Sequence, residues 1–406
     1  MISLILFWGI VFLVIYSYFL FPALVIIRGL LMARPYRASE DIPSPKLSVI
    51  IAAHNEAGTI KEKLDNIYSL DYPDDSIEVV IASDGSDDGT DEIVRGYAKE
   101  NIQLLSLPRQ GKIPALNAAA KVAKGEILVF SDANSMYAKV ALTAIVRPFA
   151  DPEVGGVAGD QRYLSTKHQG MTGQGEGIYW SLDRILKRFQ SRAGSVISAT
   201  GAIYAIRREL FREIPIGVTD DFVASTSVIA QGYRLVFAED AIAYEPVAAS
   251  SGAEFERKVR VITQGFRSVL VMHNLMNPFK YGFYALQLFS HKVLRRLLVF
   301  PLLLFLIVCP TLWQRGFVYQ AATIAQVGFY GCCILAFLLR KTGFRRLKIL
   351  SIPFFICLAY AASLLASINL LRGHRIDLWE PQRQDINEKE LKVASSMSVP
   401  SERSTS

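Results

Sequence analysis

Three polar clusters in the first third of the chain contain residue types that bind cations or nucleotides. They are residues 54–56 (HNE), 83–90 (SDGSDDGT) and 132–134 (DAN). Asp132 offers the hard oxygen ligands that Mg²⁺ and Mn²⁺ prefer. A cation held there could bridge a diphosphate and stabilise the charge on a leaving phosphate. Lys112 could neutralise the same diphosphate, although a surface lysine before a helix would show the same spacing.

Each cluster lies at or just after the end of an apolar run, which could form a strand and position the cluster. Four apolar runs of strand length alternate with helical patterns that start near 59, 88 and 114; the runs are 47–53, 77–83, 102–107 and 126–131. Such buried strands, alternating with helices, predict a doubly wound, mainly parallel α/β sheet. Ligands of these sheets bind beyond the carboxyl ends of the strands, so the clusters should converge on one crevice.

Two common nucleotide motifs are missing from the sequence. No G-x-G-x-x-G follows the first apolar run, which argues against a nicotinamide dinucleotide. Gly111 and Lys112 are followed by Ile113 rather than by Ser or Thr, so this is not the phosphate loop of nucleoside triphosphatases. The aspartates have a simpler alternative, because a single Asp before a helix is often a cap, and Asp88 fits that role.

The composition predicts a membrane part joined to a water-soluble domain. The 406 residues are 51% hydrophobic and carry a net charge of +7, with a mean hydropathy of +0.28. We assign the positive excess to Lys and Arg beside apolar segments, and no motif indicates a nucleic-acid partner. All four cysteines lie inside apolar segments, where they are expected to pack rather than to form disulfides or a zinc site.

The apolar runs predict one membrane helix before the soluble domain and three after it. Residues 1–32 are interpreted as an anchor, because 1–27 contain no charge and basic residues follow. A signal peptide is the rival interpretation, but the basic start is missing and the apolar run is too long. The remaining predicted parts are a cytosolic domain over 46–271, an interfacial helix over 278–296, three transmembrane helices within 297–371 and a disordered tail over 385–406.

Taken in order, the motifs resemble those of glycosyltransferase family 2, whose nucleotide-sugar fold is called GT-A. The resemblance covers 46–271 and rests on A-x-N-E, S-D-G-S-x-D-G-T, G-K-x-x-A-L-N and S-D-A-N, followed by the segments 198–208, 219–222 and 231–234. The layout of one apolar helix before and several after this region also resembles the membrane-bound polysaccharide synthases of the family, such as chitin-oligosaccharide, hyaluronan and poly-N-acetylglucosamine synthases.

The resemblance implies roles for residues in the first half of the domain. Glu56 and Asp84 would contact the nucleoside, with uridine as the expected base. Asp132 and Asn134 stand where the family has its D-x-D motif, which holds the metal and the diphosphate. Asn134 replaces the second aspartate, so Mg²⁺ or Mn²⁺ would be coordinated mainly by Asp132.

The resemblance also implies a catalytic base and acceptor contacts. Asp221 occupies the last position of the family's T-E-D motif and would take the proton of the attacking acceptor hydroxyl. Direct attack in line with the leaving group would invert the anomeric centre. Asp220 and Asp221 could instead mark the start of a helix. Gly201 would line the approach of the acceptor, and Trp180 would contact the acceptor or serve in packing.

The last family motif is incomplete in this chain. Processive members carry Q/R-x-x-R-W, and here Arg257 and Arg260 are kept while Val261 replaces the tryptophan. The missing tryptophan weighs against polymerising activity but not against sugar transfer. Arg257 and Arg260 could hold the diphosphate or could face lipid headgroups.

The predicted function is inverting transfer of a sugar from a nucleotide-sugar, with a UDP-sugar expected, to a growing polysaccharide at the bacterial inner membrane. The alternative is transfer of one sugar to a lipid carrier or glycolipid. A further alternative, from a different functional class, is that the chain is a non-catalytic scaffold subunit of an export complex. Expected partners are the donor, a glycan or lipid-linked acceptor and the bilayer; an export partner or an oligomer is added because four helices are few for a glycan channel.

Overall fold

The computed structural model describes residues 1–38, 44–163, 171–245, 251–339 and 347–373, and within these the side chains of 171–180 and 251–254 are not described. The chain divides into two compact units. The helical unit comprises Met1–Leu31, Ser165–Phe189 and Ala248–Arg375. The sheet unit comprises Met32–Leu164, Gln190–Val247 and Ile376–Ser406. Among the described residues, 171–189 and 251–271 thus belong to the helical unit; the sequence analysis expected one domain over 46–271, and that expectation stays a prediction.

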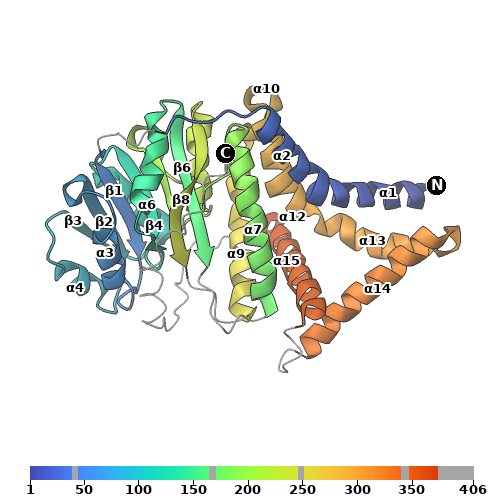
Figure 1. Ribbon diagram of the computed structural model, residues 1–406. Helices are drawn as coiled ribbons and strands as arrows, with labels where there is room; N and C mark the ends of the chain where they lie inside the picture. The colour runs from blue at the N-terminus through green and yellow to red at the C-terminus, as the bar shows by residue number, and fades with distance from the viewer. Residues whose placement is uncertain (39–43, 164–170, 246–250, 340–346, 374–406) are drawn as a thin grey trace. The chain divides into compact units, whose positions relative to one another are not determined.

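The sheet unit is built on eight strands in the order β3-β2-β1-β4-β7-β6-β8-β5 (Figure 1). The strands are β1 Leu47–Ala53, β2 Ile77–Asp84, β3 Ile102–Leu107, β4 Ile127–Asp132, β5 Met136–Tyr137, β6 Val154–Tyr163, β7 Tyr204–Arg207 and β8 Arg234–Glu245. The helices are α3 Ile60–Tyr68, α4 Thr90–Arg95, α5 Lys112–Val122, α6 Ala141–Val146 and α8 Asp220–Ala230. The four strands predicted from apolar runs are confirmed, with ends shifted by at most one residue.

The two halves of the sheet differ in strand direction. The four strands β3, β2, β1 and β4 are parallel to their neighbours. Strand β7 then runs antiparallel to both β4 and β6, β6 is parallel to β8, and β5 is antiparallel to β8. The sheet is therefore mainly parallel but mixed beyond β4, as expected of a GT-A fold.

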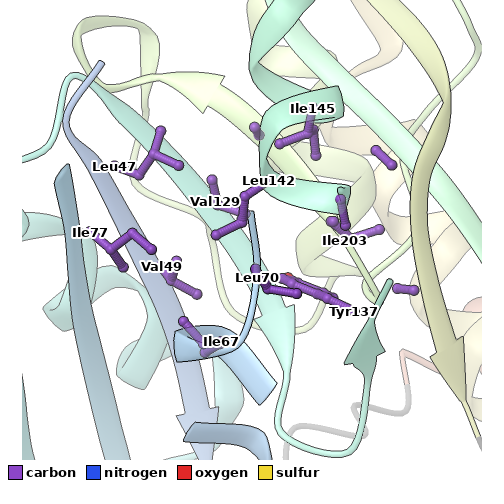
Figure 2. Packing of buried hydrophobic residues seen from close by; sticks show 14 of the residues in the cluster. Leu47, Val49, Ile67, Leu70, Ile77, Val129, Tyr137, Leu142, Ile145 and Ile203 are labelled. Atoms are coloured by element: carbon purple, nitrogen blue, oxygen red, sulfur yellow. The ribbon is translucent and has the colours of Figure 1, made fainter. Parts of the chain in front are cut away.

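Buried apolar side chains support the strands that lead to the polar clusters. Every residue of β1 is buried, so this strand is covered on both faces. On one face, Leu47 and Val49 of β1 pack with Ile67 of α3 and with Leu142 and Ile145 of α6 (Figure 2). Large apolar side chains that interlock in this way fix the strand ends relative to one another.

Arg234, the first residue of β8, joins segments that are far apart in the sequence. It is 6% exposed, and its guanidinium donates to the carbonyl oxygens of Arg34 at 2.6 Å, Gly194 at 2.9 Å and Ser191 at 3.2 Å. A buried guanidinium is costly unless its donors are used, so these contacts hold the three segments against β8.

The helical unit combines long helices with short helical segments (Figure 1). They are α1 Ile2–Ile15, α2 Phe21–Leu31, α7 Met171–Arg192, α9 Ser251–Val271, α10 Pro278–Tyr281, α11 Phe283–Leu288, α12 Arg295–Leu297, α13 Val299–Thr311, α14 Phe317–Leu338 and α15 Lys348–Leu371, with α7 ending inside the sheet unit. Among the described residues, three helices are long and apolar enough to cross a membrane: 2–31, 317–338 and 348–371.

The sequence analysis predicted an interfacial helix over 278–296 before the three transmembrane helices. In the structure, Phe283–Leu297 and Val299–Thr311 are together long and apolar enough for one membrane span, and they meet at a bend of 49°. Counting this pair gives up to four spans by length and composition. The basic link over 340–346 and the tail over 385–406 lie outside the described residues, so the domain boundaries stay predictions.

Candidate active site

The parallel register brings the polar clusters to one edge of the sheet. Ala53 lies opposite Ser83 in the pairing of β1 with β2. On the other side of β1, Ala52 lies opposite Asp132 of β4. All three strands end at this edge, so residues 54–56, 83–90 and 132–134 start from adjacent positions. The convergence predicted from the strand pattern is confirmed.

The first two clusters brace each other through hydrogen bonds. Asn55 has a left-handed backbone with a φ of 55°, which is unusual for a residue other than glycine. Its N–H donates to Ser86 Oγ at 3.1 Å, and its side-chain oxygen accepts from the N–H of Asp87 at 2.9 Å. Asp88 accepts from the N–H of Thr90, the first residue of α4, at 3.1 Å. Asp88 therefore supports the turn before α4 from one residue outside the N-cap position, which Gly89 occupies.

Asp84 organises the loop that precedes α5. Its side chain is 1% exposed and is contacted by Arg109 Nη1 at 2.5 Å, by the N–H of Gln110 at 2.6 Å and by the N–H of Gly111 at 2.9 Å. A carboxylate with these donors fixes the loop and so presents Lys112, the first residue of α5, to the crevice. The donor contact predicted for Asp84 stays a prediction.

Lys112 joins two acidic groups from separate parts of the sheet unit. Its Nζ lies 2.7 Å from Asp132 Oδ1 at the end of β4 and 3.1 Å from Asp220 Oδ2 at the start of α8. Burial alone would lower the pKa of Lys112, but the two carboxylates raise it well above its ordinary value. Lys112 is therefore a permanent cation in an acidic crevice.

Gly201 leaves the space in front of the Asp132 carboxylate open. A Cβ atom at position 201 would lie 3.0 Å from Asp132 Oδ2, and the Asp132 side chain is 30% exposed. No three His, Cys, Asp or Glu side chains gather as metal ligands in the described part of the chain. Asp132 thus suits a cation that takes its other oxygen ligands from a bound diphosphate and water, as Mg²⁺ commonly does.

The substitution Gly201→Ala tests this close approach. The added methyl group should push the Asp132 carboxylate away from its position and lower the rate of the reaction that the resemblance implies, sugar transfer, by about tenfold, because small displacements of reacting groups are costly. Steady-state rates, with the thermal unfolding midpoint as the check on folding, would measure it. A fully active Gly201→Ala protein would show that the position of Asp132 is not critical.

Asp221 lies next to the residue that Lys112 binds. It is the second residue of α8, and its Oδ1 accepts from the N–H of Phe222 at 2.7 Å. The buried Tyr204 of β7 links this site to β4: burial and the negative charges of Asp220, Asp221 and Asp132 raise the pKa of Tyr204 well above its ordinary value. The negative charges of all three carboxylates therefore act on Tyr204.

Glu56 and Asn134 complete the set that the sheet unit brings together. Burial raises the pKa of Glu56 above its ordinary value. A hydrogen bond from Thr59 lowers this pKa, and the negative charges of Asp132 and Asp88 raise it. The Thr59 hydroxyl lies 2.6 Å from Glu56 Oε2. Asn134 is partly buried and lies two residues beyond the end of β4.

Three predicted site residues belong to the helical unit. Arg257 and Arg260 lie on α9, and Trp180 lies on α7 among residues whose side chains are not described. Their contacts with donor or acceptor stay predictions.

The sequence analysis overlooked three residues of the site. Arg109 and Asp220 contact Asp84 and Lys112, as described above. The third is Lys63 of α3, which is completely buried. A signal for Lys63 was available: α3 buries Ile60, Leu64 and Ile67, and position 63 falls on that same apolar face by helical spacing.

Lys63 should make folding stability depend on pH. Burial lowers the pKa of Lys63 to about 7 from its ordinary value of 10.5, although the charges of Asp132 and Glu245 oppose this. Between pH 7 and pH 10.5 the unfolded chain binds more protons than the folded chain, so stability rises with pH across this window. One such group contributes at most about 1.4 kcal/mol per pH unit.

The measurement compares thermal unfolding midpoints of wild type and Lys63→Met in detergent from pH 7 to pH 9. The wild-type midpoint is expected to rise relative to that of Lys63→Met. Parallel midpoint curves for the two proteins would contradict the assignment.

The mixed sheet, with the polar clusters at its carboxyl edge, is that of a GT-A domain, the fold of nucleotide-sugar enzymes. Residues 48–215 match the family model described as glycosyl transferase family 2. These residues are therefore similar to the domain of glycosyltransferase family 2.

Similar proteins support this identification. The chain is 27% identical over 252 residues to the poly-beta-1,6-N-acetyl-D-glucosamine synthase of Staphylococcus epidermidis, covering 60% of this chain and 59% of that protein. The synthase of the same name from Staphylococcus aureus is 27% identical over 271 residues, covering 64% of each chain. The chain thus spans less than two thirds of the length of these relatives.

A solved structure resembles the chain over most of its length. It is the mannosyltransferase PcManGT from Pyrobaculum calidifontis, in complex with GDP-Man and Mn²⁺. The likeness has a TM-score of 0.66 and a sequence identity of 25%, and it covers 91% of this chain and 100% of the mannosyltransferase.

Proposed function

We propose that the chain transfers a sugar from a nucleotide-sugar to a growing polysaccharide at a membrane, with inversion at the anomeric centre. The observation that carries the proposal is the contact of Lys112 with both Asp132 and Asp220 at the carboxyl edge of the sheet. This arrangement places a cation and several carboxylates where GT-A folds bind donors. The likeness to poly-beta-1,6-N-acetyl-D-glucosamine synthases supports a polysaccharide product.

Each residue of the site would have a different role in sugar transfer. Asp132, with Asn134 nearby, would hold Mg²⁺ or Mn²⁺, and the bound cation supplies charge neutralisation for the departing diphosphate. Lys112 would bind the same diphosphate from the other side. Asp221 would accept the proton of the acceptor hydroxyl as that oxygen attacks the anomeric carbon. The Mn²⁺ in the mannosyltransferase complex supports the use of a divalent cation.

The donor and the compartment are also part of the proposal. The names of the synthase relatives favour N-acetylglucosamine as the transferred sugar, whereas the GDP-Man in the mannosyltransferase complex favours a GDP-linked donor. We place the sheet unit on the cytosolic side of a bacterial inner membrane, because basic residues 28–37 follow the first apolar helix.

Transfer of one sugar to a lipid carrier or glycolipid is the second candidate. Val261 stands where processive members carry tryptophan, and this supports a short product.

The test is donor turnover by the full-length protein in detergent. UDP- and GDP-linked sugars would be offered with Mg²⁺ or Mn²⁺, with and without lipid and oligosaccharide acceptors, and release of the nucleoside diphosphate would be followed. Release with one donor supports transfer, and the size of the product separates polymer from single addition. Folded protein that neither turns over nor binds any donor would favour a non-catalytic scaffold in an export complex.

A further inference from the structure

A buried lysine lies behind the turn that carries the proposed metal ligand. Lys63 of α3 is 0% exposed, and its ammonium donates to the carbonyl oxygen of Ser135. The same ammonium lies 3.6 Å from the ring centroid of Tyr137. Ser135 and Tyr137 come directly after the 132–134 segment, so Lys63 contacts the turn from its inner side.

Two further contacts hold this turn. The Ser135 hydroxyl donates to Glu245 Oε1 of β8 at 2.6 Å, so Ser135 is bound on two sides. Asn66, one turn along α3 from Lys63, donates to the carbonyl oxygen of Tyr137 at 2.9 Å and accepts from its N–H at 2.7 Å. The residues that follow Asp132 are therefore clamped between α3 and β8, next to the apolar core (Figure 2).

The cost of this arrangement indicates that it serves the site. Position 63 adjoins Ile60, Leu64 and Ile67 in the core, where an apolar side chain would pack without loss of hydration. Burying a lysine costs free energy unless its donors and charge are compensated. Compensation comes from the Ser135 carbonyl, the Tyr137 ring and the nearby charges of Asp132 and Glu245. The lysine thus favours one conformation of the turn at the expense of core packing.

We propose that Lys63 is a positioning residue, which fixes the 132–135 turn so that Asp132 and Asn134 meet the cation and diphosphate of the donor. The inference rests on the proposed function and adds to it a residue that does not touch the donor. Groups that orient metal ligands from behind commonly change metal affinity by about 10- to 100-fold when they are replaced.

The experiment measures binding of UDP and of GDP in the presence of Mn²⁺ by calorimetry, with the full-length protein in detergent. Lys63→Met removes the donor and the charge but keeps the length of the side chain. We expect it to weaken binding of the Mn²⁺–nucleotide by about tenfold or more, and to raise the donor KM more than it lowers kcat. Lys61→Met is the matched control, because Lys61 is on the same helix, is 70% exposed and pairs with the exposed Asp65.

Ser135→Ala provides a second test that spares the core. It keeps the carbonyl oxygen that Lys63 binds and removes only the link to Glu245, so binding should weaken by a smaller factor even if Lys63→Met does not fold. Wild-type affinity in folded Lys63→Met, or in Ser135→Ala where Lys63→Met is unfolded, would overturn the inference and leave the proposed function intact. Absence of nucleotide binding by wild type would overturn both.

Discussion

Replacing Asp221 by Asn is expected to lower the turnover number by about 10²- to 10⁴-fold, with little change in donor affinity. The carboxylate would be lost as a proton acceptor, while the amide oxygen can still accept the 2.7 Å hydrogen bond from the N–H of Phe222. The start of α8 should therefore be preserved. Product formation under saturating donor, together with calorimetric binding of the nucleotide, measures the two effects separately.

The outcome also decides between the two roles raised for Asp221. If Asp221 only caps α8, the amide would serve as well and turnover would remain close to that of wild type. Asp65→Asn is a suitable control, since Asp65 is an exposed carboxylate of α3 that pairs with Lys61. A low turnover number accompanied by an equally weakened nucleotide affinity would argue that Asp221 binds the donor instead.

Replacing Lys112 by Met is expected to change metal binding and donor binding in opposite directions. Its ammonium lies 2.7 Å from Asp132 Oδ1, so it competes with any other cation for that carboxylate. Without the ammonium, Mn²⁺ alone should bind about tenfold more tightly. The diphosphate would lose a fixed positive partner, so turnover should fall by about 100-fold or more.

Lys121→Met is the matched control for this pair of effects. Lys121 is on the same helix, α5, and its side chain is 64% exposed and pairs with Glu213. Manganese binding can be followed by electron paramagnetic resonance without nucleotide, and donor affinity by calorimetry. A Lys112→Met protein that loses affinity for both Mn²⁺ and nucleotide would show that Lys112 supports the shape of the crevice rather than exchanging partners.

The first half of the sheet could be predicted because its signals are local. The strands 47–53, 77–84, 102–107 and 127–132 are continuous apolar runs, and each is followed by a helix or a polar turn. Beyond β4 the sheet is mixed, and its strand β7 has only four residues. Such strands are set by pairing with distant neighbours, which a local pattern does not reveal.

The residue types of the candidate site could be predicted from the sequence, but most of the contacts between these residues could not. Asp132 and Lys112 were expected to share a diphosphate, and the structure brings them within 2.7 Å. Asp84 holds the Arg109–Gly111 loop partly through backbone N–H groups. Because nearly every residue has such a group, the residue types do not show which ones bind Asp84. Lys63 was overlooked because charged residues are expected on solvated helix faces, and only its spacing with Ile60 and Leu64 indicated burial.

The order of the strands has a consequence for the chain as it leaves the ribosome. The parallel half is complete once residue 132 has been made, but β8 ends 113 residues later, at residue 245. At about 5–20 residues per second, roughly 6 to 23 seconds separate these events. Until β7 pairs with β4 and Arg234 binds the segments near 34 and 191, the nascent sheet has an unpaired edge at β4. During that interval the nascent chain is most prone to aggregation and depends most on chaperones.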